Sequence, residues 1–300
     1  MTFPLLPPAL RPSFPQLEEK LGTCDFHLHT QLSDGVDSLE VLLQHVLDHR
    51  LGAFALTDHD TILGNASLIR LLKERRAQDP SAALPYFVPG VEMSLKEGDE
   101  IVHVLAYFPD GQTAPLVPFL RRIQSWRMAR NRLICEHLQK LSMAITMEEV
   151  YEGPPDPELI RGRVTMARLL CDKGYLTSVD EAFNKVSALA HPPMTQDLPQ
   201  ASEGVAAIRQ AGGLPILAHP YKYSLDKLHL SSLDRLVQKL VDQGLMGIEA
   251  GYWAYTPSQQ KALHQLARQF GLVVSAGSDY HGAIRRNAMY TQGYIWYQAD

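Results

Sequence analysis

Cysteine is scarce in this sequence, and the few cysteines present are not arranged in pairs. Cys24, Cys135 and Cys171 are odd in number, lie far apart and form no C-x-x-C motif. A disulfide framework is therefore not expected, and the pattern favours a reducing, cytoplasmic location.

An excess of positive charge and a long apolar run are also missing. The chain carries 28 Lys and Arg residues against 33 Asp and Glu residues, so its net charge of −5 gives no overall basic field for nucleic acid, although a local basic channel stays open. The first 20 residues have no basic start and are interrupted by prolines, which argues against a signal peptide or a membrane span. We expect residues 1–20 to form an extended leader, and we expect neither membrane contact nor an obligate protein partner.

Seven short apolar runs have the length and composition of β-strands. They lie at residues 24–28, 53–56, 87–92, 101–107, 214–218, 246–250 and 272–276. Several of these runs alternate with stretches of helical pattern, such as "SLEVLLQHVLDHR" before the second run. This alternation favours βα units and an α/β fold with a mainly parallel sheet or barrel. A length of 300 residues suits one large barrel that carries an insertion.

The strand pattern breaks between about residues 111 and 200. The segment "FLRRIQSWRMARNRLICEHLQKL" has apolar residues at helical spacing, and "TSVDEAFNKV" places Ser178 and Glu181 in the register of a capping box. We therefore expect a barrel formed by residues 21–110 and 201–300. Residues 111–200 are expected to form a helical insertion, or cap, that contributes to the substrate pocket.

Histidine is the residue type whose placement is most informative. His27 and His29 stand two residues apart in the first predicted strand, so alternation places both on one face and Phe26 and Leu28 on the other. Six of the twelve histidines, and three carboxylates, lie at or near the ends of predicted strands. The candidate ligands are His27, His29, Asp34, His59, Glu92, His103, His219, Asp279 and His281.

This set of side chains points to a centre of divalent metal ions. Active-site residues of α/β barrels gather at the carboxyl ends of the strands. Imidazole and carboxylate groups suit zinc, manganese or iron. Nine such groups exceed the coordination of one ion, so two or three ions are implied, with a carboxylate such as Glu92 bridging a pair. Surface or structural roles are expected for the other histidines, His45, His49, His137, His191, His229 and His264.

Each motif by itself also fits a plainer explanation. The His27–His29 pair is compatible with a hydrogen-bonded core pair, and a single histidine such as His103 is more often an ordinary hydrogen-bonded side chain. Asp34 in "SDG" fits a turn. Because nearly every predicted strand contributes a ligand type, the metal centre is favoured over these separate explanations.

The ordered motifs resemble the PHP (polymerase and histidinol phosphatase) family of metal-dependent phosphoesterases. The similarity runs from "DFHLHTQLSDG" through "ALTDHDT" and "PGVEMS" to "AGGLPILAHP" and "GSDYHG". It implies a distorted seven-stranded TIM-like (β/α)7 barrel with a trinuclear metal site. By resemblance, one ion is held by His27, His29, Glu92 and Asp279, a second by Glu92, His103 and His219, and a third by Asp34, His59 and His281.

The predicted insertion is similar to one branch of this family. The segment "GRVTMARLLCDKGYLTSVDEAFNKV" resembles the branch that acts on nucleotide phosphates and on the 5′ ends of short RNA. The resemblance implies that Arg163 and Lys222 bind the substrate phosphate and take part in catalysis, with Thr165 as a further substrate contact. Lys222 stands where this branch often has arginine, and Thr165 where many members have histidine. Asp60 in "TDHD" is also expected to serve catalysis, by orienting a ligand histidine.

The expected activity is the hydrolysis of phosphate esters of nucleotides by a metal-bridging hydroxide. The substrates implied are 3′,5′-bisphosphorylated nucleosides or short 5′-phosphorylated RNA, with Mn, Zn or Fe as the metal. Two alternatives stay open: a small-molecule phosphatase of the histidinol-phosphate type, and a non-catalytic binding module stabilised by metal.

Three further features have more than one interpretation. Arg121, Arg122, Arg127, Arg130 and Arg132 occupy one predicted helix, where a solvated face is favoured over a basic rim for an anionic substrate. The aromatic group that follows the sixth strand is suited either to stacking on a base or to packing against the insertion. This group comprises Tyr252, Trp253 and Tyr255. The role of Glu249 in "GIEAGY" is left open.

Overall fold

The computed structural model describes residues 23–189 and 197–282 of the chain. The leader predicted for residues 1–20, and His191, lie outside the described residues. A seven-stranded sheet with the order β1-β2-β3-β4-β5-β6-β7 forms the centre of the molecule. The strands are β1 (Cys24–Leu28), β2 (Ala53–Leu56), β3 (Tyr86–Glu97), β4 (Glu100–Tyr107), β5 (Leu214–Leu217), β6 (Gly247–Tyr252) and β7 (Val273–Gly277). All seven strands predicted from the apolar runs are confirmed.

The sheet curls into a nearly closed barrel. At the end of β1, Leu28 bridges to Tyr280, which follows β7, and the amide of His29 donates a 2.9 Å hydrogen bond to the carbonyl of Tyr280. The predicted α/β fold with a distorted seven-stranded TIM-like barrel is therefore confirmed.

One strand departs from the parallel arrangement. β4 pairs antiparallel with both β3 and β5, whereas the other neighbouring strands are parallel. Only Gly98, with a φ of +59°, and Asp99 separate β3 from β4. Two residues can close a hairpin but cannot make the crossover that a parallel pair requires. The strand-end pattern had suggested that His103 lies at the carboxyl end of its strand. The structure places it within β4 instead.

The first strand departs from simple alternation of its side chains. The register of β1 with β2 shifts between Asp25 and Leu28. Phe26 packs in an apolar cluster made of strand residues, whereas Leu28 packs in the cluster beneath α2 and α3. The expectation that Phe26 and Leu28 share one face is therefore wrong, because an irregular register reorients the strand. His27 and His29 still lie together, with ring centroids 5.1 Å apart.

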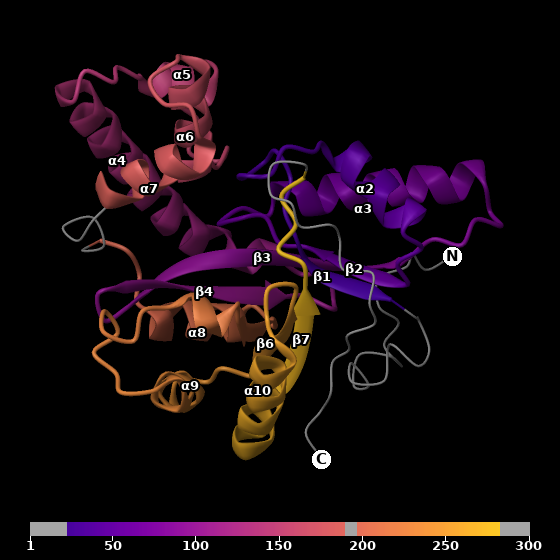
Figure 1. Cartoon of the computed structure of the whole chain (residues 1–300). Coiled ribbons are helices and arrows are strands. Elements are labelled where there is room, and N and C mark those ends of the chain that lie inside the picture. Colours follow the sequence, from indigo (N-terminus) through magenta and orange to yellow (C-terminus); the bar gives the residue numbers. More distant parts are fainter. Residues whose placement is uncertain (1–22, 190–196, 283–300) are drawn as a thin grey trace.

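Helices cover the outside of the barrel on two sides. α2 (Leu39–Asp48) and α3 (Leu63–Gln78) lie on one side of the sheet, and α8 (Ala201–Gln210), α9 (Leu233–Asp242) and α10 (Pro257–Phe270) lie on the other (Figure 1). The apolar residues of each set pack against the strands in their own buried cluster. Burial of these two faces is the main force that holds the helices on the barrel.

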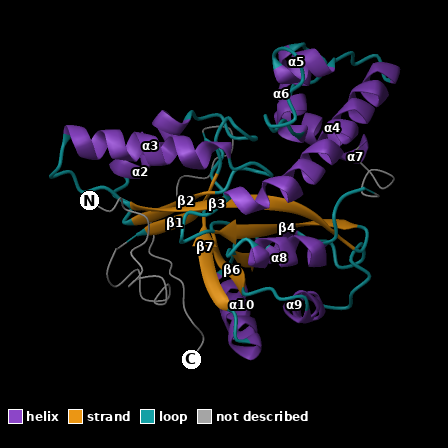
Figure 2. Ribbon diagram, turned by 180° about the vertical axis from the view of Figure 1, so that it is seen from behind, coloured by secondary structure: helices purple, strands orange, loops and turns teal. Residues whose placement is uncertain are grey.

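A group of helices between β4 and β5 forms a separate layer. It consists of η2 (Ala114–Leu116), α4 (Val117–Lys140), α5 (Met147–Tyr151), α6 (Arg163–Asp172) and α7 (Val179–Leu189). These helices stand together on one side of the sheet in Figures 1 and 2. The outer part of α4 shares an apolar cluster with α5, α6 and α7, while Leu120, Ile123 and Trp126 of its first half pack in the barrel cluster. The helix predicted to begin at Ser178 is confirmed, and the exact insertion boundaries stay a prediction.

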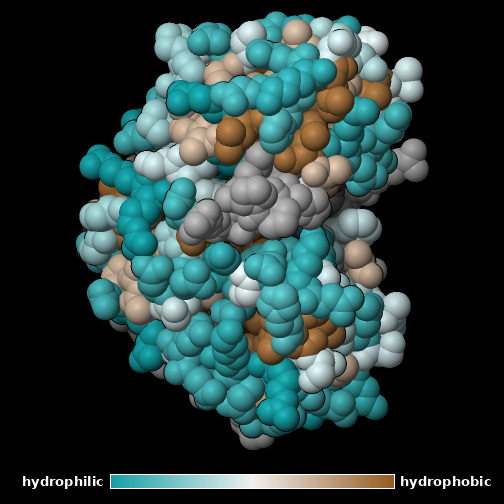
Figure 3. Space-filling view, turned by 90° about the vertical axis from the view of Figure 1, so that its left-hand side faces the viewer, coloured by the Kyte–Doolittle hydropathy of each residue, from teal (hydrophilic) through white to brown (hydrophobic). Residues whose placement is uncertain are grey.

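The face of the molecule that Figure 3 draws is mostly polar. Figure 3 shows one face that is largely hydrophilic, with apolar residues gathered in a few patches in its upper and lower parts. Within residues 23–189 and 197–282, none of the helices combines the length and the apolar character needed to cross a membrane.

Candidate metal centre

The nine predicted ligands come together at one end of the barrel. β1 provides His27, and the turn that follows provides His29 and Asp34; the other six residues lie within or just after later strands. Eight of the nine belong to three groups whose ligand atoms lie within 4.8 Å of one another. The ninth, His219, places its Nε2 atom 2.8 Å from Oε1 of Glu92.

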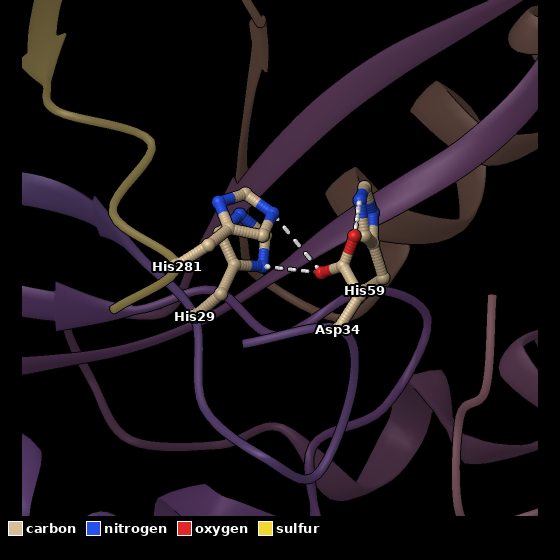
Figure 4. A group of neighbouring side chains, drawn as sticks. All are labelled: His29, Asp34, His59 and His281. Atoms are coloured by element: carbon tan, nitrogen blue, oxygen red, sulfur yellow. Dashed lines mark ion pairs between the residues drawn. The ribbon is translucent and has the colours of Figure 1, made fainter. Parts of the chain in front are cut away.

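Asp34 is at the centre of the first group, which is drawn in Figure 4. Its Oδ1 atom lies 3.1 Å from Nε2 of His281 and 3.8 Å from Nδ1 of His29, and its Oδ2 atom lies 3.8 Å from Nε2 of His59. The rings of His29 and His281 stack with centroids 4.2 Å apart. His29 thus joins the three residues that the resemblance assigns to one ion.

The second group contains His27, His29, Glu92 and Asp279. The Nε2 atom of His29 lies 3.3 Å from Oε2 of Glu92 and 3.3 Å from Oδ1 of Asp279. The Nε2 atom of His27 lies 3.3 Å and 3.5 Å from the same two oxygens. These are the four residues that the resemblance assigns to one ion.

The third group forms around the other side of Glu92. His103 Nδ1 and His219 Nε2 each lie 2.8 Å from Oε1 of Glu92, while Nδ1 of His59 lies 3.0 Å from its Oε2 atom. The carboxylate therefore contacts imidazoles with both oxygens. This arrangement suits a bridging ligand between two ions.

Buried polar atoms without hydrogen bonds show that the cluster fits divalent cations. Nε2 of His27, Nε2 of His29, Nδ1 of His59 and Oε2 of Glu92 are buried and make no hydrogen bond with any described residue. Leaving such groups unpaired costs about 1–3 kcal/mol each, so native proteins rarely tolerate several together. A nitrogen- and oxygen-rich set with unused lone pairs is the donor chemistry of zinc, manganese and iron sites.

The charge state of the first two histidines reflects their carboxylate neighbours. Burial lowers the pKa of His27, but Glu249 and Glu92 outweigh it and hold this pKa well above its ordinary value. Burial likewise opposes protonation of His29, yet Asp279 and Glu92 raise its pKa to about 9. Binding of a metal cation would displace these protons and still balance the carboxylate charges.

Two further histidines and two carboxylates of the cluster are held in the forms that bind metal. Burial lowers the pKa of His59 well below its usual range, and burial with Lys222 lowers the pKa of His219 to about 3, so both rings are neutral. Although burial opposes ionisation, neighbouring histidines hold the pKa of Glu92 and of Asp34 well below the ordinary carboxyl range. Neutral imidazole and ionised carboxylate are the ligating forms.

Glu249, whose role sequence reasoning left open, contacts two of the predicted ligands. Its Oε1 atom lies 2.9 Å from Nδ1 of His27, and its Oε2 atom accepts a 2.7 Å hydrogen bond from the amide of His219. The side chain is fully buried in β6. A carboxylate that binds the second nitrogen of a ligand histidine fixes the ring and its tautomer. An acidic residue within an otherwise apolar strand was the available signal.

Three residues at the site have unusual backbone conformations. Asp60, His219 and Asp279 have φ values of +51°, +28° and +53°, in the region that favours glycine. Such conformations cost energy and gather at functional sites, where the surrounding structure enforces them. Close packing adds to the constraint, since a Cβ atom on Gly277 would stand 2.2 Å from Cβ of His27.

Asp60 has different partners from those expected. It was predicted to orient a ligand histidine, but its Oδ2 atom accepts a hydrogen bond from Nε of Arg127 and its Oδ1 atom one of 2.6 Å from the amide of Ser94. Its carbonyl accepts a 2.9 Å hydrogen bond from Nε2 of Gln124. Through Asp60, the segment that contains His59 is bonded to α4. The contact of Asp60 with the metal cluster is therefore indirect.

The predicted phosphate-binding residues lie in two places. Lys222 Nζ is 2.7 Å from Oδ2 of Asp279, so it stands directly beside the metal cluster. Arg163 begins α6, where its guanidinium lies over the ring of Phe183 and 3.4 Å from Oγ of Ser187. Thr165 is half-buried on the same helix. The described contacts thus attach Lys222 to the metal centre and Arg163 to α7.

The arginines of α4 do not all lie on a solvated face. Arg121, Arg122 and Arg132 are exposed, as favoured from the sequence, but that interpretation is wrong for Arg127 and Arg130, which are buried. Burial, together with the charge of Arg127, holds the pKa of Arg130 well below that of an ordinary guanidinium. Helical periodicity alone did not reveal this, because Arg127 is buried against Asp60 and Ser94, which are distant in the sequence.

Comparison with known proteins places the chain among phosphoesterases. No protein-family model matches it. The chain is 30% identical over 261 residues to the 5′-3′ exoribonuclease Rnm of Salmonella typhimurium, a match that covers 86% of this chain and 84% of the relative. It is 28% identical over 264 residues to the 3′,5′-nucleoside bisphosphate phosphatase of Chromobacterium violaceum, covering 87% and 88%.

Solved structures show the same fold. An amidohydrolase from Chromobacterium violaceum, solved with sulfate and without metal, has a TM-score of 0.73 and 26% identity over 86% of this chain and 87% of its own. A protein of Bifidobacterium adolescentis has the same TM-score of 0.73 at 24% identity, with 92% of each chain covered. Fold, ligand cluster and relatives together define a metal-dependent hydrolase of phosphate esters. The chain belongs to the PHP family, as its motifs had indicated.

Proposed function

We propose that this protein hydrolyses phosphate esters of nucleotides, either 3′,5′-bisphosphorylated nucleosides or short 5′-phosphorylated RNA. The buried cluster of six imidazoles and three carboxylates carries the proposal, because it offers more ligands than one ion can use. The names of the relatives support a nucleotide or RNA substrate. Two or three ions of Mn, Zn or Fe fit the donor set.

The nine residues of the cluster would hold the ions. When bound, such ions lower the pKa of water and act as Lewis acids toward a phosphoryl oxygen. Glu249 orients His27 for this purpose, and Glu92 contacts both halves of the cluster. The chain thus prepares the metal centre through its own hydrogen bonds.

Lys222 and Arg163 are the proposed contacts of the substrate phosphate, with Thr165 as a further donor. Lys222 brings a positive charge to the edge of the metal cluster, where phosphoryl oxygens gain charge during reaction. A lysine acts here as a point charge and lacks the two-pronged geometry of arginine.

Arg130 extends this basic region into the insertion. Its guanidinium donates a 3.1 Å hydrogen bond to the amide oxygen of Asn131 and lies over the ring of Trp126. Asp60 attracts it electrostatically, but no ion pair joins Arg130 to a carboxylate in the described part of the chain. A buried guanidinium without a carboxylate is costly, and an anionic ligand offsets that cost. Arg127 and Arg163 lie close enough to Arg130 to depress its pKa. This supports a cap, residues 111–200, that contributes to the substrate pocket.

The cytoplasmic location predicted from the cysteine pattern stays a proposal. All three cysteines are free thiols in the structure, and two of them are buried. Reduced cysteines of this kind are usual in proteins of the cytoplasm.

The test is a substrate panel with the metal-stripped and metal-loaded protein. Nucleoside 3′,5′-bisphosphate, short 5′-phosphorylated RNA and histidinol phosphate are offered with and without Mn²⁺. We expect turnover of the nucleotide substrates only with Mn²⁺, and slower turnover of histidinol phosphate. The variant His29→Ala should lose more than about 100-fold in kcat/KM together with bound metal, while its circular dichroism is retained.

The control variant is His229→Ala, whose histidine pairs with Asp99 at the surface. It should match the unaltered protein in metal content and rate. Full activity after metal removal would contradict the proposal. A preference for histidinol phosphate would show that the substrate is a small-molecule phosphate and not a nucleotide.

A further inference from the structure

Four aromatic rings form a continuous row beside Lys222. The ring centroids of Trp253 and Tyr252 are 5.9 Å apart, those of Tyr252 and Tyr255 are 5.0 Å apart, and those of Tyr255 and Tyr221 are 5.3 Å apart. The amide of Tyr221 also donates a 3.2 Å hydrogen bond to the hydroxyl of Tyr255. We call these four residues the aromatic row. Tyr252 is the last residue of β6, Trp253 and Tyr255 follow it, and Tyr221 follows β5, at the end of the barrel that carries the metal cluster.

Tyr252, the buried member of the row, is hydrogen-bonded to the metal cluster. The hydroxyl of Tyr252 donates a 3.1 Å hydrogen bond to Oδ2 of Asp279, the oxygen that Lys222 also contacts. The ammonium of Lys222 lies 4.6 Å from the centroid of the Tyr252 ring. A phosphate held beside Lys222 therefore lies next to the row.

The outer members of the row face solvent. Trp253 is 50% exposed and Tyr221 is 39% exposed, whereas Tyr252 is 3% exposed. Large aromatic side chains gain more than most residues from burial, so the exposed ends of a row anchored on the buried Tyr252 call for an occupant. The interaction that suits a flat ring face is stacking, and nucleobases present such faces.

We propose that the aromatic row, which is exposed at its two ends, Trp253 and Tyr221, is the platform on which the base of the substrate stacks while its phosphate lies at Lys222 and the metal cluster. This inference rests on the proposed nucleotide substrate and extends it to the part that recognises the base. Stacking accepts every base, so the row would favour nucleotides over base-free phosphates without selecting one sequence.

The test compares two phosphate esters that differ in the base. Nucleoside 3′,5′-bisphosphate and ribose 5-phosphate are assayed with Mn²⁺ for the unaltered protein, Trp253→Ala and Tyr221→Ala. We expect the ratio of kcat/KM for the nucleotide to that for the sugar phosphate to fall about 5- to 100-fold in Trp253→Ala, mainly through KM. Tyr221→Ala should lower the ratio in the same direction, and Trp253→Phe should restore most of it.

Leu141→Ala is the matched control, because Leu141 is also 50% exposed but ends α4. It should leave the ratio as it is. An unchanged ratio in both Trp253→Ala and Tyr221→Ala would overturn the platform and leave the row as packing.

Failure of the proposed function has a different signature. An unaltered protein that hydrolyses neither substrate overturns the proposed function. The platform is then judged by binding, as the difference in nucleotide-induced fluorescence quenching between the unaltered protein and Trp253→Phe. Quenching that depends on Trp253 supports the platform. If nucleotide causes no such quenching, the platform is overturned together with the proposed function.

Discussion

Among single residues, Glu249 links two histidines that come from different strands. One carboxylate oxygen contacts Nδ1 of His27 and the other accepts from the amide of His219. Because Nδ1 is engaged, Nε2 of His27 is the nitrogen that faces Glu92 and Asp279. The tautomer that the ring takes up when a metal ion displaces its proton is thereby set.

Replacing Glu249 by Gln should weaken metal binding while the fold persists. The amide is close in size but removes the charge that favours the required tautomer, and loss of such a partner typically costs about 10- to 100-fold in metal affinity. Titration calorimetry with Mn²⁺ measures the change. Glu203→Gln, which alters an exposed carboxylate paired with Arg122, is the control. Equal affinities in both variants would contradict the assigned role.

Cys135 offers a test of burial within the insertion. Burial, reinforced by Glu149 and Glu136, raises the pKa of its thiol from 9.0 to about 11. A raised thiol pKa means that folding favours the protonated form, so this contribution to stability is present below pH 9 and is lost as the pH rises through 11. The thiolate is the reactive form.

Alkylation at pH 9 should therefore modify Cys135 far more slowly in the folded protein than in urea. Cys171, which is half-buried, is the internal reference. Peptide mass spectrometry after iodoacetamide treatment measures both sites. Equal labelling rates of Cys135 in the folded and unfolded states would show that the thiol is not protected.

Among elements, α4 is as much a support of the barrel as a part of the insertion. Arg127 binds the carboxylate of Asp60 and donates a 2.9 Å hydrogen bond to Oγ of Ser94, while Gln124 holds the carbonyl of Asp60. The amide of Asp60 in turn donates a 2.9 Å hydrogen bond to the carbonyl of Glu92. The helix thereby fixes the strained turn that presents a ligand histidine.

Arg127→Met should lower the free energy of unfolding by about 3–5 kcal/mol, because it leaves the buried Asp60 without its partner. Urea denaturation measures the loss. The double variant Arg127→Met with Asp60→Asn should recover part of it, since no unpaired charge remains. Arg121→Met, at an exposed position of the same helix, should stay within about 0.5 kcal/mol of the unaltered protein. An equally small effect of Arg127→Met would show that Arg127 does not stabilise the barrel through Asp60.

At the scale of the whole molecule, the metal centre joins strands that are far apart in the chain. β1, β3 and β4 contribute ligands directly, and the segments after β1, β2, β5 and β7 contribute the rest. The unfolded chain does not hold these groups together, so an ion binds the folded barrel in preference. Metal binding is therefore coupled to stability.

Adding Mn²⁺ to the metal-stripped protein at about 100 times its dissociation constant should stabilise the fold by about 2.7 kcal/mol. For a chain of this size, the melting temperature should rise by roughly 5 °C. Differential scanning fluorimetry measures the shift. The variant His29→Ala removes a member of two ligand groups and should show little shift, whereas an equal shift in both proteins would place the stabilising ion elsewhere.

Much of the architecture was accessible from local pattern. The seven strands appear as apolar runs bounded by turns, and ligand types such as His27 and Glu92 stand out because polar groups are rare in buried strands. The orientation of β4 was not deduced, although the two residues that separate it from β3 require a hairpin. The burial of Arg127 could not be predicted, because its partner Asp60 is 67 residues away in the chain.

By itself, the sequence determined the α/β barrel, the nine candidate ligands and the family, since periodicity and motif spacing are properties of neighbouring residues. Only the tertiary structure decided that Glu249 orients His27, that Asp60 binds α4 and that an exposed aromatic row stands beside Lys222. Each of these contacts joins segments separated by many residues. Their pairing depends on how the barrel closes and how the helices pack, which local sequence preferences do not specify.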